Sequence, residues 1–432
     1  MRKSILILAM IALVAVFAIS CKSEPVHEHG YVIEKYDDTN HWKECECGEK
    51  SDIANHSLSA WTVSEEGIAT RKCACGYIEK AEGKAVAVSN ASELTAALSE
   101  ANTKIFLDSD IVLENTLKFN DGNKHKIDLN GHSISKDSIP VYIINAEVEF
   151  TGSGTIQETE SDNFAAILLK GSEADVADYS VVTVGKDITL KGWSGVMVDQ
   201  LSSKENKRQA YGVVVNMYGK IVVPSEETHA SGNGIYVNGS IQDIGGNNPV
   251  INIDGAEIIA NEVGIYAAGY AKWNIKNAKI EAVNALSLKA GTFVIDGGSY
   301  KSTGTFADPS EDTSNGSVET GAALSMTSND RYAHKLDVTV NDGTFESVNG
   351  YAVYEGIPNT PGTSIPVATD SYVTLAINGG KFEGNSEKGS IKLSKIKNSK
   401  IVSSGVFNSD PSAYLVEGAS VKESDGLWSV SK

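Results

Sequence analysis

The chain has few prolines and few arginines for its length. Its 432 residues include nine prolines and 40 glycines. Arginine stands at four positions, Arg2, Arg71, Arg208 and Arg331. A chain rich in glycine and poor in proline suits short strands joined by tight turns better than long helices. The formal net charge of -19 at pH 7 disfavours nucleic acid and anionic lipid headgroups as partners of the folded part.

Common catalytic motifs are also missing from the sequence. We find no G-x-S-x-G nucleophile turn, phosphate-binding loop, H-E-x-x-H zinc helix or dinucleotide-binding glycine pattern. The stretch "HEHG" at His27–Gly30 is too short to be a metalloprotease motif. The enzyme classes that depend on these motifs are therefore not expected.

A long hydrophobic run occurs only near the N-terminus. Ile5–Ile19 is uninterrupted and apolar, and it follows the cationic start "MRK". The run is too short for a comfortable membrane span but suits the core of a signal peptide. We therefore predict a signal peptide over residues 1–20.

Small residues meet a lone cysteine in "FAISC", which ends at Cys21. This end resembles the bacterial lipoprotein lipobox, in the relaxed form of spirochaete lipoproteins, with Ala18 where leucine is commonest. The resemblance implies that Cys21 carries acyl chains such as palmitate and anchors the protein to the bacterial cell envelope. Lys22 and Ser23 follow without the aspartate that retains some lipoproteins at the inner membrane, so we expect the outer membrane or cell surface. An ordinary secretory signal with a chance cysteine is the alternative.

Residues 21–83 are distinguished by cysteine and histidine. Two matching knuckles, "WKECECGEK" and "TRKCACGYI", carry Cys45, Cys47, Cys73 and Cys75. Two such pairs brought together make a four-thiolate site that suits tetrahedral zinc. Disulfides between the knuckles are an alternative in an exported protein, and unmodified thiols are another. Nearby histidines could complete or replace ligands, namely His27, His29, His41 and His56.

The same module resembles short Cys-rich repeats in surface proteins of anaerobic bacteria and treponemes. The shared pattern is "HW..C.CG" followed by "G...RKC..CG". Cysteine is missing from the "SEEG" segment, where many such repeats have one. The resemblance implies a spacer that holds the rest of the chain away from its lipid anchor.

From residue 84 onward the sequence becomes repetitive. The residues around 92–101 predict a short helix, capped by Ser92, with Leu94, Ala97, Leu98 and Ala101 on one face. Strand–turn–strand units then recur, beginning at Ile251, Trp273, Phe293, Val338 and Leu375. The first intervals are 22 and 20 residues, and the 45-residue interval before Val338 is interpreted as two periods. A period near 20 residues with alternating apolar positions predicts a solenoid.

Residues 84–432 resemble the right-handed parallel β-helix of the pectate-lyase-like superfamily. "ASELTAALSEANTKIFLDSDIVLENTLKFNDGNKHKIDLNGHSIS" is similar to the N-terminal cap and first coils of bacterial surface β-helices, and residues 403–432 to their C-terminal end. The resemblance implies an all-β fold with a capping helix. It leaves the activity open, because this fold carries many functions.

Enzymes of that superfamily use converging acidic residues, with an arginine base in the lyases. Arg208 and Arg331 are the arginines of the repeat region, and neither belongs to such a motif. Asp254 and Asp296 occupy equivalent turn positions, with Asn277 near the turn between them. Converging oxygens suit calcium, but turns favour Asp and Asn for backbone reasons, so we interpret all three as turn residues.

Other candidate residues also have structural interpretations. Asp108–Asp110 reads as a charged turn, and His132 as a first-coil turn residue with no carboxylate pair beside it in sequence. Trp273, Tyr351 and Tyr354 are candidate sugar-stacking aromatics, interpreted as packing residues. Long insertions in the repeat are expected to form loops that line a binding face.

Together these features favour a non-catalytic cell-surface lipoprotein. The β-helix would act as an adhesin that binds a glycan or a host or cell-surface protein, with no nucleic acid partner. Structural zinc is expected only in the Cys/His module. The alternative is a polysaccharide lyase or glycoside hydrolase acting on acidic polysaccharide, and a carboxylate-plus-base cluster on one outward sheet would distinguish it.

Overall fold

A computed structural model gives the fold of most of the chain. It describes residues 28–100, 102–160, 164–200, 210–224, 232–243, 245–307, 320–327, 335–356, 373–394, 396 and 398–432. The predicted signal peptide at residues 1–20 and the predicted lipidation site Cys21 lie outside the described residues. No helix among the described residues is both long enough and apolar enough to span a membrane.

The chain folds into two compact units, and each unit is made of two separate segments of the sequence. Residues 1–60 and 70–80 form the smaller unit, and residues 61–69 and 81–432 form the larger one. A short segment that includes β4 (Thr62–Val63) thus belongs to the larger unit, although it lies between two parts of the smaller unit in sequence.

The smaller unit consists of antiparallel strands with almost no apolar core. A three-stranded sheet has the order β1 (Ile33–Tyr36), β2 (Asn40–Glu44) and β3 (Lys50–Asn55), and β5 (Ala69–Lys72) pairs with β6 (Ile78–Lys80). Within the described part of this unit, the buried residues are Cys45 and Cys73, which are 3% and 6% exposed. Domains this small usually need a disulfide or a metal to be stable, because they bury too little apolar surface.

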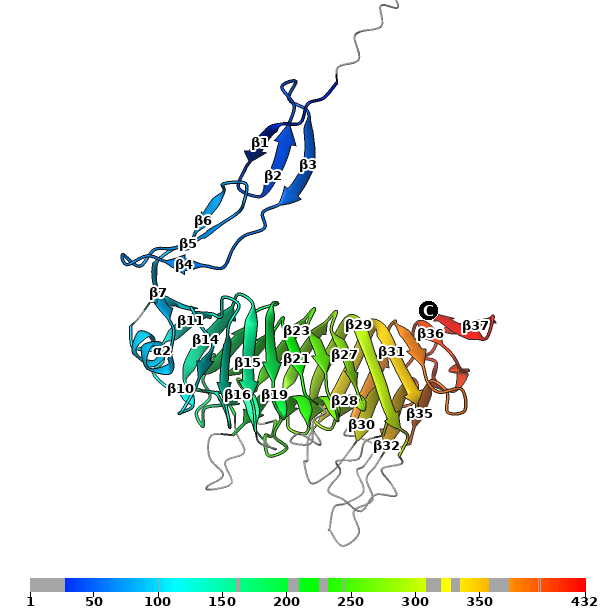
Figure 1. Ribbon diagram of the computed structural model, residues 1–432. Coiled ribbons are helices and arrows are strands. Elements are labelled where there is room, and N and C mark those ends of the chain that lie inside the picture. The colour runs from blue at the N-terminus through cyan, green and yellow to red at the C-terminus, as the bar shows by residue number, and fades with distance from the viewer. Residues whose placement is uncertain are drawn as a thin grey trace, which may run out of the picture. The chain divides into compact units, whose positions relative to one another are not determined.

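The larger unit is built from two long, mostly parallel sheets of 10 and 22 strands (Figure 1), and the strand pairing divides the 22-stranded sheet into two columns, which makes three columns in all. The first is a 10-stranded sheet of β10 (Leu117–Phe119), β13 (Val141–Ile144), β16 (Ala165–Lys170), β19 (Ser194–Asp199), β22 (Asn233–Val237), β25 (Val263–Ala267), β28 (Asn284–Leu288), β30 (Leu324–Thr327), β32 (Val353–Gly356) and β35 (Ile391–Leu393). The second column contains β7 (Lys84–Val88), β8 (Thr103–Leu107), β11 (Lys124–Asp128), β14 (Ala146–Thr151), β17 (Ser180–Val184), β20 (Val213–Met217), β23 (Val250–Asp254), β26 (Lys272–Lys276), β29 (Gly291–Thr305), β31 (Leu336–Asn349) and β33 (Val373–Ile377).

The third column runs beside the second. It contains β9 (Ile111–Val112), β12 (Ser133–Lys136), β15 (Gly154–Glu158), β18 (Ile188–Lys191), β21 (Lys220–Val222), β24 (Glu257–Ile259), β27 (Lys279–Ala282), β34 (Lys381–Glu383) and β36 (Gly405–Phe407). The long strands β29 and β31 pass through both columns. The larger unit is thus mostly β-strand with long parallel sheets, an arrangement compatible with a parallel β-helix.

The strand register confirms the predicted repeat alignment. Ile251 pairs with Trp273, Trp273 with Phe293, Phe293 with Val338, and Val338 with Leu375. All five side chains are buried, between 0% and 7% exposed. Because Phe293 and Val338 are direct partners, the 45-residue interval is one step of the strand register and not two. The interpretation of this interval as two periods was therefore wrong.

Aromatic rings stack along the core from coil to coil. The ring centroid of Phe345 lies 4.7 Å from that of Tyr300 and 5.0 Å from that of Phe382, and Phe382 lies 5.0 Å from Phe407. All four side chains are fully buried. Parallel in-register pairing places equivalent residues directly above one another, so one aromatic position per coil produces a continuous stack.

A helix and a hairpin lie at opposite ends of the larger unit (Figure 1). Helix α2 (Ala91–Leu98) confirms the predicted helix, and Leu94 and Ala97 are buried as expected. The predicted cap was wrong, because the side chain of Asn90 accepts the backbone N–H of Glu93 at 3.0 Å and Ser92 lies inside the helix. Ala101 lies outside the described residues.

At the C-terminal end the pairing changes from parallel to antiparallel. Strand β38 (Leu427–Ser431) pairs antiparallel with both β36 and β37 (Ser420–Ser424), after a short 3-10 turn at Ser412–Tyr414. This hairpin covers part of the edge of the last coil, which would otherwise offer open backbone groups for aggregation.

Phe345→Ala should destabilise the larger unit by about 3–5 kcal/mol, because it leaves a cavity within a close-packed ring stack. Chemical denaturation followed by circular dichroism measures the change. Val348→Ala is the matched control on the same strand, since Val348 is 43% exposed and should change stability by less than about 0.5 kcal/mol. If the two substitutions lowered the free energy of unfolding equally, the ring stack would not be a main source of stability.

Candidate functional site

The two Cys-x-Cys-Gly knuckles form the tight turns of two β-hairpins. In the first, the backbone N–H of Cys45 donates to the carbonyl of Glu49, and the N–H of Gly48 donates to that of Cys45, both at 2.8 Å. The turn at Cys73–Tyr77 repeats these bonds at 2.9 and 3.0 Å. Gly48 and Gly76 have φ of 88° and 95°, which glycine adopts without strain. The repeated sequence thus encodes one backbone turn used twice.

A third turn in the larger unit has the same backbone bonds without cysteine. The N–H of Ser64 donates to the carbonyl of Ile68, and the N–H of Gly67 donates to that of Ser64, both at 2.9 Å. Ser64 and Glu66 stand where the knuckles have their two cysteines. This is the "SEEG" segment that departs from the Cys-rich pattern. Since the turn forms without thiols, the cysteines of the knuckles are not needed for the turn itself.

The structure does not assemble the expected four-thiolate site. It forms two groups, and within each group the donor atoms all lie within 4.8 Å of one another. We call them the Cys73 group (His41, His56, Cys73 and Cys75) and the Cys45 group (His29, Cys45 and Cys47). Each knuckle closes its own hairpin, so its thiols meet the histidines packed beside that hairpin instead of the other knuckle. Among the described cysteines no disulfide bond is formed, so the alternative of disulfides between the knuckles is not seen there.

In the Cys73 group, His56 is oriented as a metal-binding histidine is. Nδ1 of His56 lies 3.3 Å from Sγ of Cys75, and Nε2 lies 2.8 Å from the carbonyl oxygen of Asp37. A carbonyl at Nε2 requires the proton there, which leaves the Nδ1 lone pair directed to the thiol. The ring of His56 stacks on that of Tyr77, with centroids 4.1 Å apart and planes within 5°. Tyr77 thereby fixes the orientation of the imidazole.

The second histidine of this group has a buried nitrogen with no protein partner. Nδ1 of His41 is inaccessible to solvent and makes no hydrogen bond within the described chain. The rings of His41 and His56 stack with centroids 5.8 Å apart. A buried polar atom without a partner costs free energy that a bound cation would recover.

The surroundings of the Cys73 group also shift its acidity. The hydrogen bond from the backbone N–H of Cys75, with the side chains of Cys75 and His56, lowers the pKa of Cys73 to about 6. The carbonyl of Asp37 raises the pKa of His56, and burial raises the pKa of Cys75. The lowered pKa of Cys73 favours its thiolate, the form that binds metals.

The Cys45 group repeats this geometry with one ligand fewer. Nδ1 of His29 lies 3.3 Å from Sγ of Cys47, and its Nε2 lies 2.8 Å from Oε2 of Glu49. A carboxylate behind a histidine orients a metal-binding imidazole in the same way as a carbonyl. Cys45 is buried, whereas His29 and Cys47 are exposed. Both groups could therefore hold a metal ion. His27 lies outside the described residues.

The acidic turn residues do not converge. Asp254 and Asp296 are two coils apart in register, and Lys276 lies between them. Asp296 accepts a hydrogen bond from Nδ2 of Asn341 at 2.7 Å. Asn277 has a φ of 48°, a turn conformation that asparagine tolerates. Arg208 and Arg331 lie outside the described residues.

Asp110 and His132 meet between neighbouring coils. Oδ1 of Asp110 accepts both the backbone N–H and the hydroxyl of Ser133, at 2.8 and 3.0 Å, and lies 3.7 Å from Nδ1 of His132. The backbone hydrogen bond from Ser133 lowers the pKa of Asp110. These contacts join one turn to the next.

The candidate aromatic residues differ in exposure. Trp273 is 1% exposed and stacks on Phe293 inside the coil, so it cannot stack on a sugar. Tyr354 is also 1% exposed, whereas Tyr351, whose ring lies 5.8 Å from that of Tyr354, is partly exposed. Lys392 lies over both tyrosine rings, 5.6 and 5.9 Å from their centroids.

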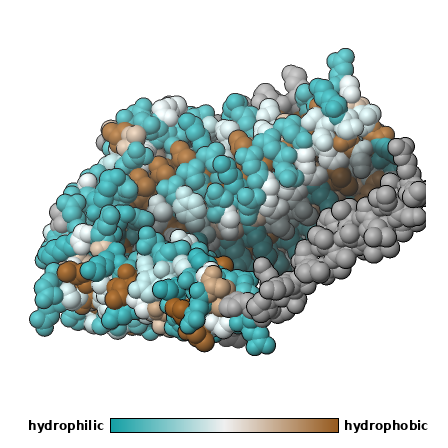
Figure 2. All heavy atoms as spheres, turned by 90° about the horizontal axis from the view of Figure 1, so that it is seen from above, coloured by the Kyte–Doolittle hydropathy of each residue, from teal (hydrophilic) through white to brown (hydrophobic). Residues whose placement is uncertain are grey.

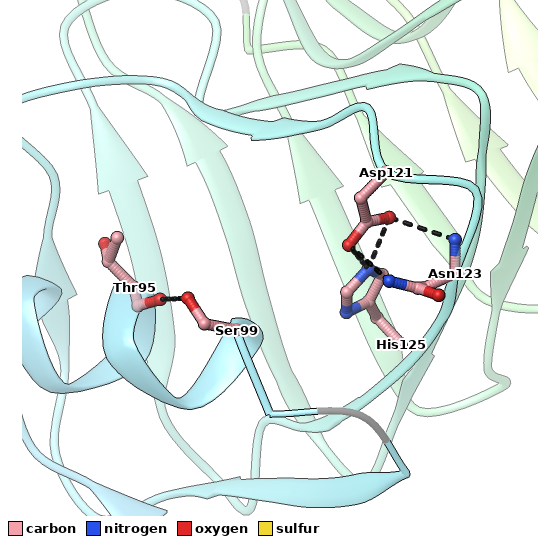
Figure 3. A network of polar contacts seen from close by, with 5 residues as sticks. All are labelled: Thr95, Ser99, Asp121, Asn123 and His125. Carbon is pink, nitrogen blue, oxygen red and sulfur yellow. Dashed lines mark hydrogen bonds and ion pairs between the residues drawn. The ribbon is translucent and has the colours of Figure 1, made fainter.

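Sequence reasoning missed a histidine–carboxylate pair near the helix (Figure 3). Nε2 of His125 lies 3.1 Å from both carboxylate oxygens of Asp121, and Asn123 donates to the same carboxylate from its backbone and side chain. Burial would raise the pKa of Asp121, but these hydrogen bonds outweigh it and lower the pKa. The pair lines a cavity of about 510 Å³ that also includes Thr95 and Ser99. An i, i+4 spacing on a strand and turn gives no sequence signal for such a contact.

The sequence also gave no sign of a buried lysine. Lys289 is 3% exposed, and its Nζ donates to the hydroxyl of Tyr266 at 2.7 Å. Burial lowers the pKa of Lys289 to about 7. Its burial follows from its place next to β28, which only the coil register determines.

No protein-family model, no curated protein and no solved structure matches this chain.

Lys289→Met should reduce the pH dependence of stability. An unfolded lysine has a pKa near 10.4, so between about pH 7 and pH 10 the unfolded chain binds a proton that the folded chain does not. The free energy of unfolding should therefore rise with pH, by at most about 1.4 kcal/mol per unit from this group, and the variant should lose that rise. Urea denaturation at pH 7 and pH 9 measures it.

Lys276→Met is the matched control, because Lys276 is exposed on a neighbouring coil and should leave the pH dependence unchanged. If both variants showed the same dependence as the unsubstituted chain, the buried amine would not titrate as described.

Proposed function

We propose that this chain is a non-catalytic, lipid-anchored surface protein whose larger unit is a right-handed parallel β-helix that binds a ligand. Cys21 would carry the acyl chains, the Cys/His module would act as a spacer, and the β-helix would bind a glycan. The fold part of this proposal is supported by three columns of parallel strands that return in register once per coil.

The observation that carries the non-catalytic proposal is the pairing of outward carboxylates with lysines. Glu257 lies 3.2 Å from both Lys220 and Lys279, on the coils before and after it. The hydrogen bonds from these lysines lower the pKa of Glu257. A general acid needs a carboxyl group whose pKa is raised, so this pairing has the opposite effect.

Amide side chains form similar ladders between coils. Nδ2 of Asn252 donates to Oδ1 of Asn216 at 2.9 Å, and Nδ2 of Asn274 donates to Oδ1 of Asn252 at 2.8 Å. Figure 2 shows one face on which hydrophilic residues predominate. These side chains hydrogen-bond to one another along the surface and so stabilise the stacked coils. They are not arranged around a point where a substrate atom could react.

A row of apolar and aromatic side chains on the 10-stranded sheet supports ligand binding. Register places Tyr142, Leu168, Met197, Tyr236 and Tyr266 on successive coils. Leu168 is buried, and the other four side chains are partly exposed. The rings of Tyr236 and Tyr266 stack 5.5 Å apart with planes within 9°. Both tyrosines are half-buried. Because the two rings stack on each other, the row offers their edges, together with the side chain of Met197, to successive sugar rings at coil spacing.

For the metal, we propose structural zinc in the Cys73 group. Two thiols and two imidazoles make up the ligand set of a closed tetrahedral zinc site. In a unit whose described buried residues are two cysteines, such an ion would replace the missing apolar core.

The double variant Tyr142→Ala/Tyr236→Ala keeps the Tyr266 hydroxyl to which the buried Lys289 donates, and it should weaken polysaccharide binding at least about tenfold, since each lost ring contact contributes about 1 kcal/mol or more. Purified chain is titrated with acidic and neutral polysaccharides, with and without calcium, while product length is recorded. Tyr218→Ala is the control, because Tyr218 is 42% exposed and lies outside the row. Shortened products would favour a lyase or hydrolase, and no binding by any form would exclude a glycan ligand from the panel.

Cys73→Ser/Cys75→Ser should remove one tightly bound zinc ion per chain and lower the melting temperature of the smaller unit, because zinc binding and folding are coupled in such modules. Elemental analysis of protein kept reduced during purification measures the zinc. Ser51→Ala is the control, because it removes a hydroxyl on β3 that makes no contact with the group in the described structure, and it should leave the zinc content unchanged. Full zinc content in the cysteine variant would contradict the assignment.

A further inference from the structure

The Cys45 group repeats, in an independent part of the chain, the constellation found in the Cys73 group. In each group a histidine Nδ1 lies 3.3 Å from a thiol, and its Nε2 lies 2.8 Å from an oxygen acceptor. The acceptor is a backbone carbonyl in one group and the carboxylate of Glu49 in the other. The histidines come from different segments, so this likeness does not follow from the repeated knuckle.

The groups differ in the number of ligands and in exposure. Within the described residues, the Cys45 group has three potential ligands and the Cys73 group has four. The side chain of His29 is 36% exposed, and Cys47 is also exposed. Glu49 lies on the far nitrogen of His29, where it orients the ring instead of completing the ligand set.

From these differences we propose that His29, Cys45 and Cys47 form a second, open site for a thiophilic cation of the Zn²⁺ type. A tetrahedral ion held by three protein ligands keeps its fourth position for water or for an incoming donor. The ion at this site exchanges with solvent and accepts a nitrogen or sulfur ligand from outside the chain. The Cys73 group uses all four positions and excludes such a ligand. This assignment does not depend on the proposed binding function of the larger unit.

Cobalt substitution of two double variants separates the sites. Cys73→Ser/Cys75→Ser leaves the Cys45 group intact, and Cys45→Ser/Cys47→Ser leaves the Cys73 group intact. Each full-length variant, reduced and in detergent, is titrated with Co²⁺, whose thiolate charge-transfer and d–d absorption report its ligands. We expect tetrahedral thiolate spectra from both.

Imidazole is then added to each cobalt-loaded variant. The d–d bands of the variant that retains the Cys45 group should shift, because imidazole takes the fourth position, and those of the variant that retains the Cys73 group should not. Failure of the Cys45 group to bind Co²⁺ through thiolates, or absence of an imidazole shift there, overturns the proposal. Loss of binding only in the variant that retains the Cys73 group would instead contradict the structural zinc proposed above.

A charge-matched pair tests the role of Glu49. Glu49→Ala should weaken Zn²⁺ binding at the Cys45 group about 10–100-fold, the usual effect of losing the group that orients a ligand histidine. Glu46→Ala removes the same charge from the same loop, but Glu46 is exposed and no contact joins it to His29 in the described structure. Equal weakening by both variants would mean that only the charge matters, and His29 would then not be an oriented ligand.

Discussion

The larger unit depends on in-register parallel pairing between strands one coil apart. Each pairing places a residue directly over its equivalent, so a buried position in one coil is buried in the next. Ile251, Trp273, Phe293, Val338 and Leu375 follow one another in this way. Both the apolar core and the surface ladders result from the same register, because side chains alternate inward and outward along every strand. A slip of one residue would exchange the two faces.

The smaller unit is organised by a different constraint. Its strands bury almost no apolar surface, and its buried residues in the described chain are Cys45 and Cys73. The side chains that meet in its interior are thiols and imidazoles, which attract cations. The third turn, at Ser64–Ile68, forms the same hydrogen bonds without thiols, and it belongs to the unit that has a large apolar core. Cysteines thus occur in the turns of the unit that lacks a core.

The proposed functions of the two units follow from these constraints. A surface whose carboxylates are paired with lysines is rigid and ionised, which suits presentation of a binding face better than acid–base chemistry. The proposed spacer must be stable without a large apolar core, and a closed metal site provides that stability. At the proposed open second site, a molecule from outside the chain can bind the fourth position of the metal ion. Each assignment rests on contacts within one unit.

The sequence by itself determined the strand–turn–strand repeat, the core positions and the two knuckle turns. These are local properties, because alternation, glycine at a left-handed turn and coil spacing are all readable along the chain. It also predicted the helix at Ala91–Leu98, although it misplaced the cap by two residues. Only the tertiary structure decided that Phe293 and Val338 lie on adjacent coils and that each knuckle meets histidines instead of the other knuckle. An insertion lengthens the interval between two strands without changing which strands pair, so spacing alone misjudged the Phe293–Val338 pairing. The neighbours of a thiol depend on how hairpins pack, so spacing could not predict the histidines beside each knuckle.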